Sequence, residues 1–555
     1  MPTLGINISH DASAAITIDG EIVASAAEER FSRVKNDGSF PEAAIRFCLD
    51  QAGLTEEDID ALALPRPHDP LRYLDRLVLP DEAYGKLGLP PRQDLYPIWK
   101  KMFRLRNLRQ LYNIHHHKAH AASTYYTGGI FDRPVLIVTM DGAGNDYSNA
   151  IWLGRDGKID LLKSFPTSSS IGWFYAVATE ALGWVSSSQE WKLMGLAPYG
   201  TPQPGRLDGF HPVFKDGDLV QPHRFAWATT MERGYYAYHS GDAAGLKTIA
   251  DALGPEDFAA EVQRVSEEQA FNLILPWLKR TGARDIACSG GFFLNVKFNQ
   301  KLWETGLLDS QWIFPDAGDS GLSAGAALFA DFDRSPGLRR PKTRSMYLGP
   351  SYGAADIEKI LKERQIAYTK PADLPGTIAD YLVQNRVVGF FQGRMELGPR
   401  ALGSRSILMS PLKAENKDIV NSKIKFRESF RPFCPSLLAE KAGEYFDIWR
   451  EELFMTTSFA VKPKAAERIP AVVHVDGTAR PQMVLKETNP RFHAVISEFG
   501  KRTGEYIVMN TSFNLAGEPV VCSPRDALRT FFDSGIDVLV LEDCVIEKPG
   551  LENVG

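Results

Sequence analysis

The chain has 555 residues, of which 44% are apolar and 24% are charged, and its formal net charge is −6. This length is too great for one ordinary hydrophobic core, so we expect two large units in a soluble globular protein. The acidic balance gives no general reason to expect nucleic acid or an anionic membrane surface as a partner.

Cysteine usage and hydropathy indicate the compartment. The five cysteines are scattered, without a Cys-x-x-Cys pair, which argues against a zinc ribbon or a disulfide framework and favours a reducing environment. The first apolar stretch is interrupted by His10 and Asp11, unlike a signal peptide, and no segment reaches an uninterrupted transmembrane length. We therefore expect a cytoplasmic protein.

The first part of the chain predicts three strands, over residues 3–8, 14–19 and 21–28. His10 and Asp11 lie in the polar turn after the first strand. Actin-like and sugar-kinase-like ATPases begin in this way, with the turn facing phosphate, but a plain turn capped by Asp11 is the open alternative. Before a helix expected from Pro41 to about Gly53, Lys35 either reaches an anionic ligand or belongs to a solvated charged face.

Four of the eleven histidines lie within residues 115–120. In a helix, His116 and His120 lie on one face and can close on one cation. A predicted strand then delivers Asp141 into a glycine turn, and Asp319 lies in a second acidic glycine loop. These four residues form a predicted metal site, with a histidine-rich turn without ligand as the alternative. Acidic turns after strands, at Asp11, Asp141 and Asp319, indicate a duplicated, two-lobed nucleotide-binding fold.

Loops rich in small residues are candidates for nucleotide contacts in the first half. The stretch 186–200 precedes a helix start and includes Lys192, so it predicts an anion site, with a linker as the alternative. Gly290 and Gly291 follow a strand at 285–288 and permit close approach of an adenosine, unless they form a plain tight turn. The other candidates for nucleotide binding are Gly142, Gly144 and Asn295.

Helices are also expected around 173–184, 258–280 and 323–329. Residues 64–110 show mixed periodicity and are expected to form an irregular, partly helical insertion, and 201–255 a polar, less regular excursion. Residues 331–345, rich in Arg and Pro, form the best domain boundary. We place one domain at 1–335 and the other at 345–555.

The second half carries a basic cluster inside an acidic protein. Between residues 392 and 431 there are nine Lys and Arg against four Asp and Glu, next to a predicted strand at 387–391. Cations among Gly and Pro beside apolar strands predict a phosphate pocket, with a nucleic-acid stripe as the competing interpretation. Arg480, in a predicted turn, and the polar loop 510–512, after a predicted strand that begins at 507, add to this basic cluster. The candidate residues are Arg400, Lys425, Arg427, Arg431, Arg480, Asn510, Thr511 and Ser512.

Together these stretches resemble one family, the NodU/CmcH-type O-carbamoyltransferases. The resemblance runs over nearly the full chain, and its several separate blocks make it specific. In the first half the matching stretches are His10–Ala14, His115–Ser123, Lys192–Gly200 and Gly318-Asp319. In the second half they are Gly398–Gly403, Arg427–Phe433, His474–Gln482 and Asn510–Asn514. Ser186–Gln189 departs from the family, which has a more glycine-rich loop, so the ligand contacts of this loop stay open.

The resemblance implies an α/β fold in two parts. The first is a two-lobed actin-like ATPase domain, a duplicated ribonuclease H-like fold similar to the tRNA threonylcarbamoyl transferase, and the second is a YrdC-like α/β domain. In the family, the second domain joins carbamoyl phosphate and ATP to give carbamoyl adenylate and pyrophosphate. The first domain transfers the carbamoyl group to a hydroxyl of a sugar or natural product.

Site residues follow from the resemblance position by position. Arg400, Lys425, Arg431 and Arg480 match the family's phosphate- and carbamoyl-binding cations, and Asn510 with its neighbours matches the loop that lines the same pocket. His116, His120, Asp141 and Asp319 match its metal ligands, which hold Fe²⁺ or another divalent ion such as Mg²⁺ or Mn²⁺. Lys35 and His10 match positions near the acceptor and the transferred group. His10 or Asp11 is our hypothesis for the base that takes the acceptor's proton.

The sequence leaves the acceptor open among a nodulation factor, an aminoglycoside, a β-lactam precursor and an aminocoumarin sugar. We expect no nucleic-acid or membrane partner, and a homodimer is one open oligomeric state. The rival interpretations are a tRNA-modifying enzyme, a hydrogenase-maturation enzyme, and a non-enzymatic sensor or sugar-kinase-like protein with the actin-like fold.

Overall fold

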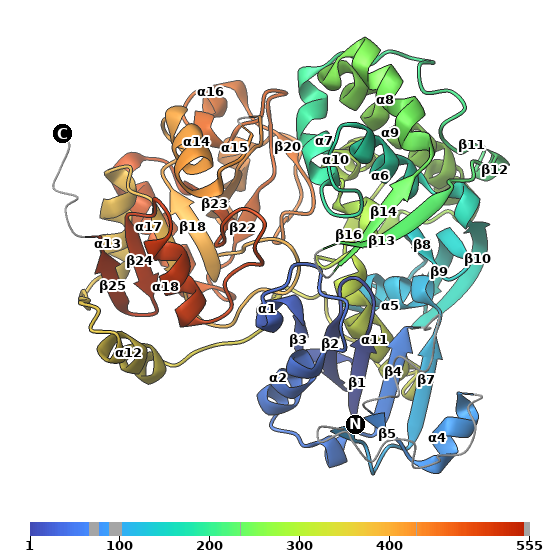
Figure 1. Cartoon of the computed structure of the whole chain (residues 1–555), viewed down its shortest axis with the longest axis horizontal. Helices are drawn as coiled ribbons and strands as arrows, with labels where there is room; N and C mark the ends of the chain where they lie inside the picture. Colours follow the sequence, from blue (N-terminus) through green and yellow to red (C-terminus); the bar gives the residue numbers. More distant parts are fainter. Residues whose placement is uncertain (66–76, 88–102, 233–234, 429, 549–555) are drawn as a thin grey trace. The chain divides into compact units, whose positions relative to one another are not determined.

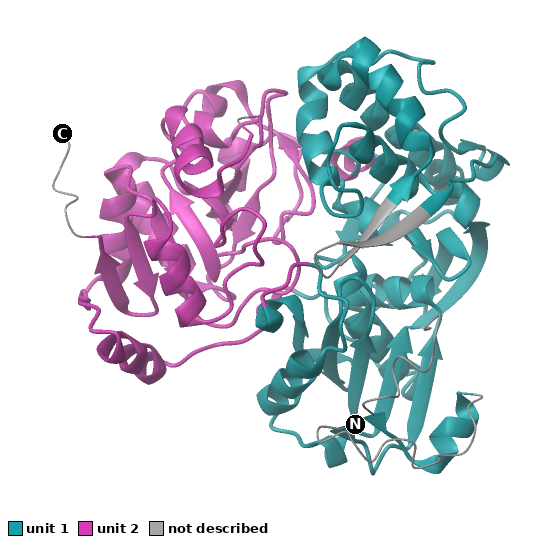
Figure 2. Ribbon diagram, in the orientation of Figure 1, with its two compact units in different colours: residues 1–32, 36–298, 305–343 teal, residues 33–35, 299–304, 344–555 magenta. Residues whose placement is uncertain are grey.

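The computed structural model describes residues 1–65, 77–87, 103–232, 235–428 and 430–548 (Figure 1). The chain divides into two compact units (Figure 2). Unit 1 comprises residues 1–32, 36–298 and 305–343, and unit 2 comprises 33–35, 299–304 and 344–555. The division falls after Thr343, inside the segment 331–345, and two short pieces of the first half group with unit 2.

The first sheet of unit 1 has the strand order β3-β2-β1-β4-β7. β1, β2 and β3 are antiparallel neighbours, whereas β4 and β7 run parallel to β1. β1 and β2 are buried on both faces, and Leu4 and Ile16, which are Cα partners in the register, belong to the core. The bounds are β1 Pro2–Asn7, β2 Ser13–Ile18, β3 Glu21–Ala27, β4 Ala61–Pro65 and β7 Gln110–Ile114.

The second sheet repeats this topology with the order β10-β9-β8-β15-β16. β8, β9 and β10 are antiparallel neighbours, and β15 and β16 run parallel to β8. The bounds are β8 Val135–Gly144, β9 Tyr147–Arg155, β10 Lys158–Pro166, β15 Asp285–Ser289 and β16 Ser310–Ile313. Unit 1 therefore contains two sheets of the same order and strand directions, as a duplicated fold requires.

Helices pack on and between these sheets. α11 contacts β1, β2, β4 and α5, and α5 also contacts β8 and β15, so these two helices link the sheets. Small residues of α11 allow this: a Cβ on Gly325 would lie 2.1 Å from the carbonyl oxygen of Ala119. The helices of unit 1 are α1 Glu29–Ser32, α2 Glu42–Ala52, α4 Asp81–Lys86, α5 His116–Gly128, α6 Ile171–Ala181, α7 Glu190–Leu196, α8 Asp242–Leu253, α9 Pro255–Thr281 and α11 Leu322–Arg334. Helix α10 Val296–Glu304 is divided, because its residues 299–304 group with unit 2.

Two segments are more regular than the sequence predicts. Residues 201–255 contain helix α8 and two hairpins, formed by β11 Val213–Lys215 with β12 Asp218–Gln221 and by β13 Trp227–Glu232 with β14 Tyr235–Ser240. Residues 64–110 contribute the end of β4, the start of β7, helix α4 and the short pair β5 Leu77–Val78 and β6 Phe103–Arg104. β5, β6, β11 and β12 have two to four residues, too few for a periodic hydrophobic pattern, whereas β13 and β14 have six residues each and were not predicted. Residues 66–76 and 88–102 of the predicted insertion lie outside the described residues.

Unit 2 is built on a seven-stranded mixed sheet with the order β22-β19-β23-β18-β17-β24-β25. β22 with β19 and β17 with β24 are parallel pairs, and the other neighbours are antiparallel. The bounds are β17 Val388–Phe391, β18 Arg405–Met409, β19 Cys434–Leu438, β22 Gln482–Val484, β23 Ile507–Ser512, β24 Val538–Leu541 and β25 Cys544–Glu547.

One layer of helices completes the core of unit 2. α13 Leu374–Val383 and α17 Pro490–Thr503 pack together, and their buried residues, such as Ile378 and Phe492, join those of the sheet. The remaining helices are α12 Ala354–Glu363, α14 Glu415–Val420, α15 Ala442–Tyr445, α16 Pro463–Ala466 and α18 Pro524–Phe532. Both units are mixed α/β, which confirms the predicted class. In the described part of the chain, no helix combines the length and the apolarity that a bilayer span needs.

Candidate functional site

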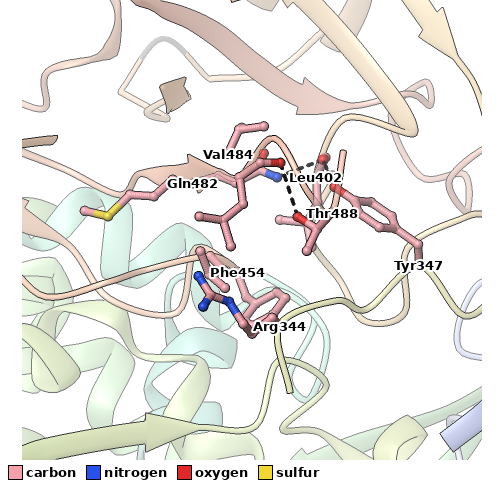
Figure 3. A pocket seen from close by; sticks show the side chains of 10 residues that line it. Arg344, Tyr347, Leu402, Phe454, Gln482, Val484 and Thr488 are labelled. Atoms are coloured by element: carbon pink, nitrogen blue, oxygen red, sulfur yellow. Dashed lines mark hydrogen bonds between the residues drawn. The ribbon is translucent and has the colours of Figure 1, made fainter. Parts of the chain in front are cut away.

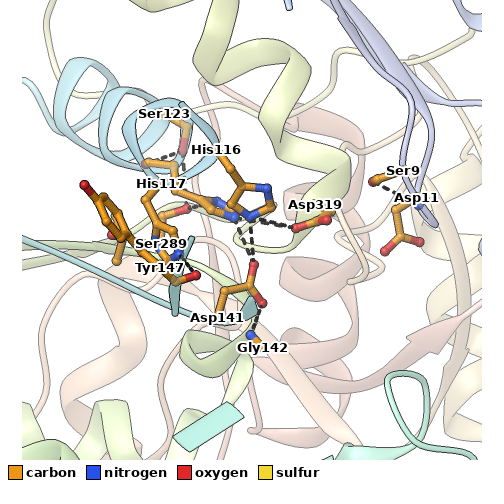
Figure 4. Close-up of polar contacts among 12 residues, drawn as sticks. Ser9, Asp11, His116, His117, Ser123, Asp141, Gly142, Tyr147, Ser289 and Asp319 are labelled. Carbon is orange, nitrogen blue, oxygen red and sulfur yellow. Dashed lines mark hydrogen bonds and ion pairs between the residues drawn. The ribbon is translucent and has the colours of Figure 1, made fainter. Parts of the chain in front are cut away.

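Two histidines of α5 and a carboxylate from β8 form the centre of the candidate site in unit 1 (Figure 4). Because α5 begins at His116, His116 and His120 are one turn apart on one helix face. Asp141 lies where β8 loses its regular pairing with β9, after Met140. The Nε2 atoms of His116 and His120 lie 3.2 and 3.1 Å from Oδ2 of Asp141. Two imidazoles thus share one carboxylate oxygen.

Asp319 supplies a second carboxylate from the 3-10 turn Asp319–Gly321 before α11. Its Oδ1 lies 3.5 Å from Nε2 of His116 and 3.6 Å from Nε2 of His120. One donor atom from each of the four residues lies within 4.8 Å of the others. Two imidazole nitrogens and two carboxylate oxygens suit a first-row divalent ion. The structure brings together the four predicted ligands, and the ion stays a prediction.

The charges of this cluster depend on one another. Burial alone would raise the pKa of Asp141, but hydrogen bonds from His116 and His120 hold it well below its usual range. Burial alone would lower the pKa of His120, but hydrogen bonds to Asp141 and Asp319 raise it to about 9. The buried carboxylates therefore require a positive charge beside them, which an imidazolium or a bound cation can supply.

Neighbouring residues fix the two imidazole rings. Ser289, the last residue of β15, places its Oγ 3.2 Å from Nδ1 of His120. Gly144 leaves room for the other ring, because a Cβ there would lie 2.1 Å from Cδ2 of His116. Such contacts decide which ring nitrogen faces the carboxylates. Ser289 was not among the predicted site residues, although its place at a strand end before two glycines is a usable signal.

The turn after β1 joins the same cluster through His10. Nδ1 of His10 lies 3.6 Å from Oδ2 of Asp319, and its Nε2 lies 3.3 Å from Oδ2 of Asp11. Asn36 donates to Oδ1 of Asp11 at 2.7 Å and receives a hydrogen bond from Ser188 at 3.4 Å. Burial raises the pKa of Asp11. Burial alone would lower the pKa of His10, but the charges of Asp11 and Asp319 raise it above its usual value. Asn36 was missed, because loop contacts follow no periodic spacing.

The glycines predicted to contact a nucleotide surround Asp141. Gly290, at φ 105°, has no space for a side chain, since a Cβ would lie 2.1 Å from the carbonyl oxygen of Met140. At Gly291 a Cβ would lie 3.0 Å from Oδ1 of Asp141, and Gly142 donates its N–H to that oxygen at 2.7 Å. These positions keep the backbone open beside the carboxylate.

The two remaining nucleotide candidates have partners of their own. The amide of Asn295 exchanges two hydrogen bonds with Gln263, at 3.0 and 3.1 Å. The Nζ of Lys192 lies 5.6 and 5.7 Å from the ring centres of Trp184 and Trp191. Their contacts with a nucleotide stay predictions.

In unit 2, Lys425 is buried and reaches the loop after β23. Its Nζ donates to the carbonyl oxygen and to Oδ1 of Asn514, at 3.0 and 2.9 Å, and also contacts Ser512. Burial, and then the charges of Arg427, Arg431 and Lys35, hold the pKa of Lys425 well below its usual range. Strand alternation puts Asn510 and Ser512 on one face of β23, so Thr511 belongs to the opposite face.

Four arginines accompany this lysine. Burial, and then the charge of Arg480, lowers the pKa of Arg400 to about 9, and burial with Arg427 lowers that of Arg431 to about 9. Nε and Nη2 of Arg480 donate to Sγ of Cys434 at 3.1 and 2.8 Å. Within the described part of the chain, no carboxylate forms an ion pair with Arg400 or Arg480. Arg431 pairs with Glu428 at 3.5 Å, so the mutual repulsion of the cluster is offset only in part.

A buried glutamate shapes the loop that carries Arg400. Oε1 of Glu396 accepts the backbone N–H groups of Leu402, Ser404 and Arg405 at 2.7, 2.9 and 3.1 Å. The carbonyl oxygen of Leu402 accepts from the hydroxyl of Tyr347 and the amide of Gln482, both at 2.8 Å. A small hollow borders this contact, and its walls include Arg344, Tyr347, Leu402, Phe454, Gln482, Val484 and Thr488 (Figure 3).

Asn510 holds the same loop from β23. Its Nδ2 donates to the carbonyl oxygen of Ala401 at 3.1 Å and to Oγ of Ser436 at 2.9 Å. Among the described residues, no group donates to its buried Oδ1. The sequence analysis singled out Asn510 but missed Glu396, Gln482 and Ser436, whose positions in short strands and loops carry no spacing signal.

Comparison with known proteins gives two family models that together cover most of the chain. Residues 2–70 and 84–328 match the model described as carbamoyltransferase N-terminus, and residues 379–548 match carbamoyltransferase C-terminus. An uncharacterised protein of Synechocystis is 35% identical over 97% of this chain and 95% of its own length. The nodulation protein NolNO of Sinorhizobium fredii is 32% identical over 97% of this chain and 79% of its own length.

Solved structures resemble the chain only weakly. Full-length HypF in its phosphate- and nucleotide-bound form is 12% identical, with a TM-score of 0.36 over 60% of this chain and 56% of its own. A ROK family glucokinase from Streptomyces griseus, in complex with glucose and AMPPNP, is 12% identical, with a TM-score of 0.28 over 59% of this chain and 99% of its own. Scores of this size establish neither a shared fold nor a shared function.

Proposed function

We propose a reaction for this chain, which belongs to the carbamoyltransferase family: the ATP-dependent transfer of a carbamoyl group from carbamoyl phosphate to a hydroxyl. Unit 2 joins the carbamoyl group to AMP, and unit 1 passes it on to the acceptor. In the first half-reaction, carbamoyl phosphate, ATP and one water give carbamoyl adenylate, pyrophosphate and orthophosphate. In the second, the acceptor oxygen forms a bond to the carbamoyl carbon, and AMP leaves.

The single observation that carries this proposal is the cation cluster of unit 2. Carbamoyl phosphate and ATP are both anions, so their approach requires several fixed positive charges. Burial, and then the charges of neighbouring cations, lowers the pKa of Lys425 and of the arginines around it, and phosphate oxygens would stabilise these charges. The residues that we propose to bind both substrates are Arg400, Lys425, Arg427, Arg431, Arg480, Asn510, Thr511 and Ser512.

Two fold assignments accompany the proposal. The repeated sheet topology of unit 1, with acidic turns at Asp11, Asp141 and Asp319, supports a duplicated ribonuclease H-like domain of the actin-like ATPases. For unit 2 we propose a YrdC-like domain, on the strength of the resemblance of its motifs.

In unit 1, His116, His120, Asp141 and Asp319 would hold a divalent ion, with Fe²⁺ first and Mg²⁺ or Mn²⁺ as alternatives. Such an ion supplies a Lewis acid for carbonyl or phosphate oxygens. The chain's own part is to hold the carbamoyl donor beside the polar turn and to take the proton of the acceptor hydroxyl. We propose that His10 is the base that takes this proton. Its Nε2 lies 3.3 Å from the Asp11 carboxylate.

The acceptor is proposed as a small molecule with a free hydroxyl. Relatives named as nodulation proteins support a nodulation factor or another sugar, and an aminoglycoside or a β-lactam precursor are further candidates. The net charge of −6 favours neither nucleic acid nor an anionic membrane, and we propose a cytoplasmic site of action.

The experiment is phosphate analysis with purified protein, ATP, Fe²⁺ and carbamoyl phosphate, without an acceptor. We expect pyrophosphate and orthophosphate in equal amounts, and only when carbamoyl phosphate is present. Arg400→Ala and Lys425→Ala should abolish both, whereas Lys413→Ala, at an exposed position of the same unit, should not. No pyrophosphate from protein that binds both substrates would reject the adenylating function and favour a nucleotide- and metal-binding sensor or a sugar-kinase-like protein.

A further inference from the structure

An aromatic side chain faces solvent within the cation cluster of unit 2. Phe426 is 65% exposed, although Lys425 before it is buried. Arg427 after it turns inward, donates to Oδ1 of Asn421 at 2.6 Å, and lies 4.4 Å from the ring centre of Phe433. One apolar ring therefore projects outward between two cations that point into the unit.

The backbone produces this arrangement at a cost. Residues Asn421–Lys425 form a single turn of π-helix, and the N–H of Phe426 donates to the carbonyl oxygen of Asn421. Phe426 itself has φ 44° and ψ 53°, the left-handed region that bulky side chains avoid. π-helical turns and left-handed residues are both concentrated at functional sites. The extra residue of the turn directs Lys425 inward and Phe426 outward.

The turn alone does not explain the phenylalanine, because glycine or asparagine would adopt this backbone with less strain. Among the described residues, Phe426 is the only large apolar side chain that combines an exposed position with a left-handed backbone. No aromatic or cation–π contact joins its ring to another described residue. A single ring of this kind is also too small for an apolar docking patch.

We propose that Phe426 is the residue on which the purine base of ATP stacks, an inference that rests on the proposed adenylating function of unit 2. ATP carries a flat aromatic base at one end and a triphosphate at the other. Proteins bind such ligands with an aromatic platform beside a cationic groove. Adjacent Cα atoms are about 3.8 Å apart, so the backbone that carries the ring directly adjoins the backbone that carries the two cations.

This proposal gives each residue of the turn a separate role. Lys425 and Arg427 contact phosphate oxygens, and Phe426 contacts the base. The strain at Phe426 is then offset in the complex by the stacking contact, which the protein without nucleotide does not make. Unit 2 would then recognise the base of the nucleotide as well as the charge of its phosphates.

The test compares three substitutions at one position. We expect Phe426→Leu to raise the KM for ATP in pyrophosphate release about ten-fold, within the range of measured base stacking. The KM for carbamoyl phosphate and the kcat at saturating ATP should stay within about two-fold of the parent. Phe426→Trp should keep the parent KM for ATP. Phe532→Leu, an exposed aromatic position at the end of α18, is the matched control.

Phe426→Gly separates binding from folding. Glycine fits the left-handed backbone, so this variant should unfold at an equal or higher urea concentration than the parent and still bind ATP more weakly. An unchanged KM for ATP in both the Leu and Gly variants would overturn the proposal. A variant that no longer forms a dimer in light scattering but keeps the parent KM for ATP would also overturn the proposal, because the ring would then dock a second copy of the chain.

A failure of the proposed adenylating function can be distinguished from a failure of the stacking contact. If the parent protein releases no pyrophosphate, calorimetric titration with ATP still measures the stacking contact. Weaker ATP binding by Phe426→Leu than by the parent would support the contact, and equal binding would overturn it.

Discussion

Replacement of Glu396 tests how the Arg400 loop is held. Oε1 of this buried carboxylate accepts three backbone N–H groups, from Leu402, Ser404 and Arg405. A hydrogen bond to a charged group contributes about 1.5–3 kcal/mol, against about 0.5–1.5 kcal/mol between neutral groups. Glu396→Gln keeps an acceptor oxygen but loses the charge, so three bonds together lose about 3 kcal/mol.

The assay is amide hydrogen exchange of the peptide that covers residues 397–406. About 3 kcal/mol corresponds to exchange about 100-fold faster at the three donors in Glu396→Gln, if the loop opens locally. The KM for carbamoyl phosphate should rise with it, because Arg400 loses its fixed position. Glu415→Gln, at an exposed position of the same unit, is the control. Exchange within about two-fold of the parent would refute the argument that this carboxylate holds the loop.

Glu396→Ala is expected to behave differently. It would leave three buried donors without a partner, at about 1–3 kcal/mol each, which approaches the whole stability of a domain. We expect this variant to be insoluble or partly unfolded, so the glutamine variant is the informative one.

Three further outcomes follow from unit 1. His120→Ala should reduce bound Fe²⁺, measured by metal analysis after dialysis, to less than a tenth of one equivalent, whereas His493→Ala in unit 2 should not change it. Burial raises the pKa of Asp316 from its usual value to about 7, so the folded state holds this proton more tightly than the unfolded state. The stability contributed by this group therefore falls as pH rises from about 4 to about 7. In urea unfolding, Asp316→Asn should gain about 4 kcal/mol of stability relative to the parent over that interval. Stability curves that stay parallel across this pH range would contradict this. Asn36→Ala should slow carbamoyl transfer to an acceptor at least ten-fold without slowing pyrophosphate release, because Asn36 orients Asp11 at 2.7 Å; equal loss of both steps would contradict this role.

Several features of the candidate metal site could be predicted because they follow regular geometry. A spacing of four on a helix puts His116 and His120 on one face. Asp141 lies near the end of β8, and Asp319 lies in the turn before α11. Hydrophobic runs also predicted strands β1, β2, β3, β8 and β15 of unit 1, but only β17 and β23 of the seven-stranded sheet of unit 2. The repetition of acidic turns indicated the duplicated topology that the two sheets of unit 1 share.

Other features had no such regularity. Asn36 contacts Asp11, which lies in another loop, and Glu396 accepts backbone N–H groups of its own loop. Neither kind of contact leaves a periodic pattern in the sequence. The π-helical turn before Phe426 is a local irregularity that a 3.6-residue period does not contain. The hairpin strands within 201–255 show no strict alternation of apolar and polar side chains, so the sequence pattern did not indicate them.

The nucleotide product tests the central claim most directly. Purified protein, given ATP, Fe²⁺, carbamoyl phosphate and a hydroxyl acceptor, should convert ATP into AMP, with one pyrophosphate and one carbamoylated acceptor for each AMP formed. AMP in this ratio is the result expected if unit 2 makes carbamoyl adenylate and unit 1 consumes it. Formation of ADP, or carbamoylated acceptor without AMP, would contradict the account.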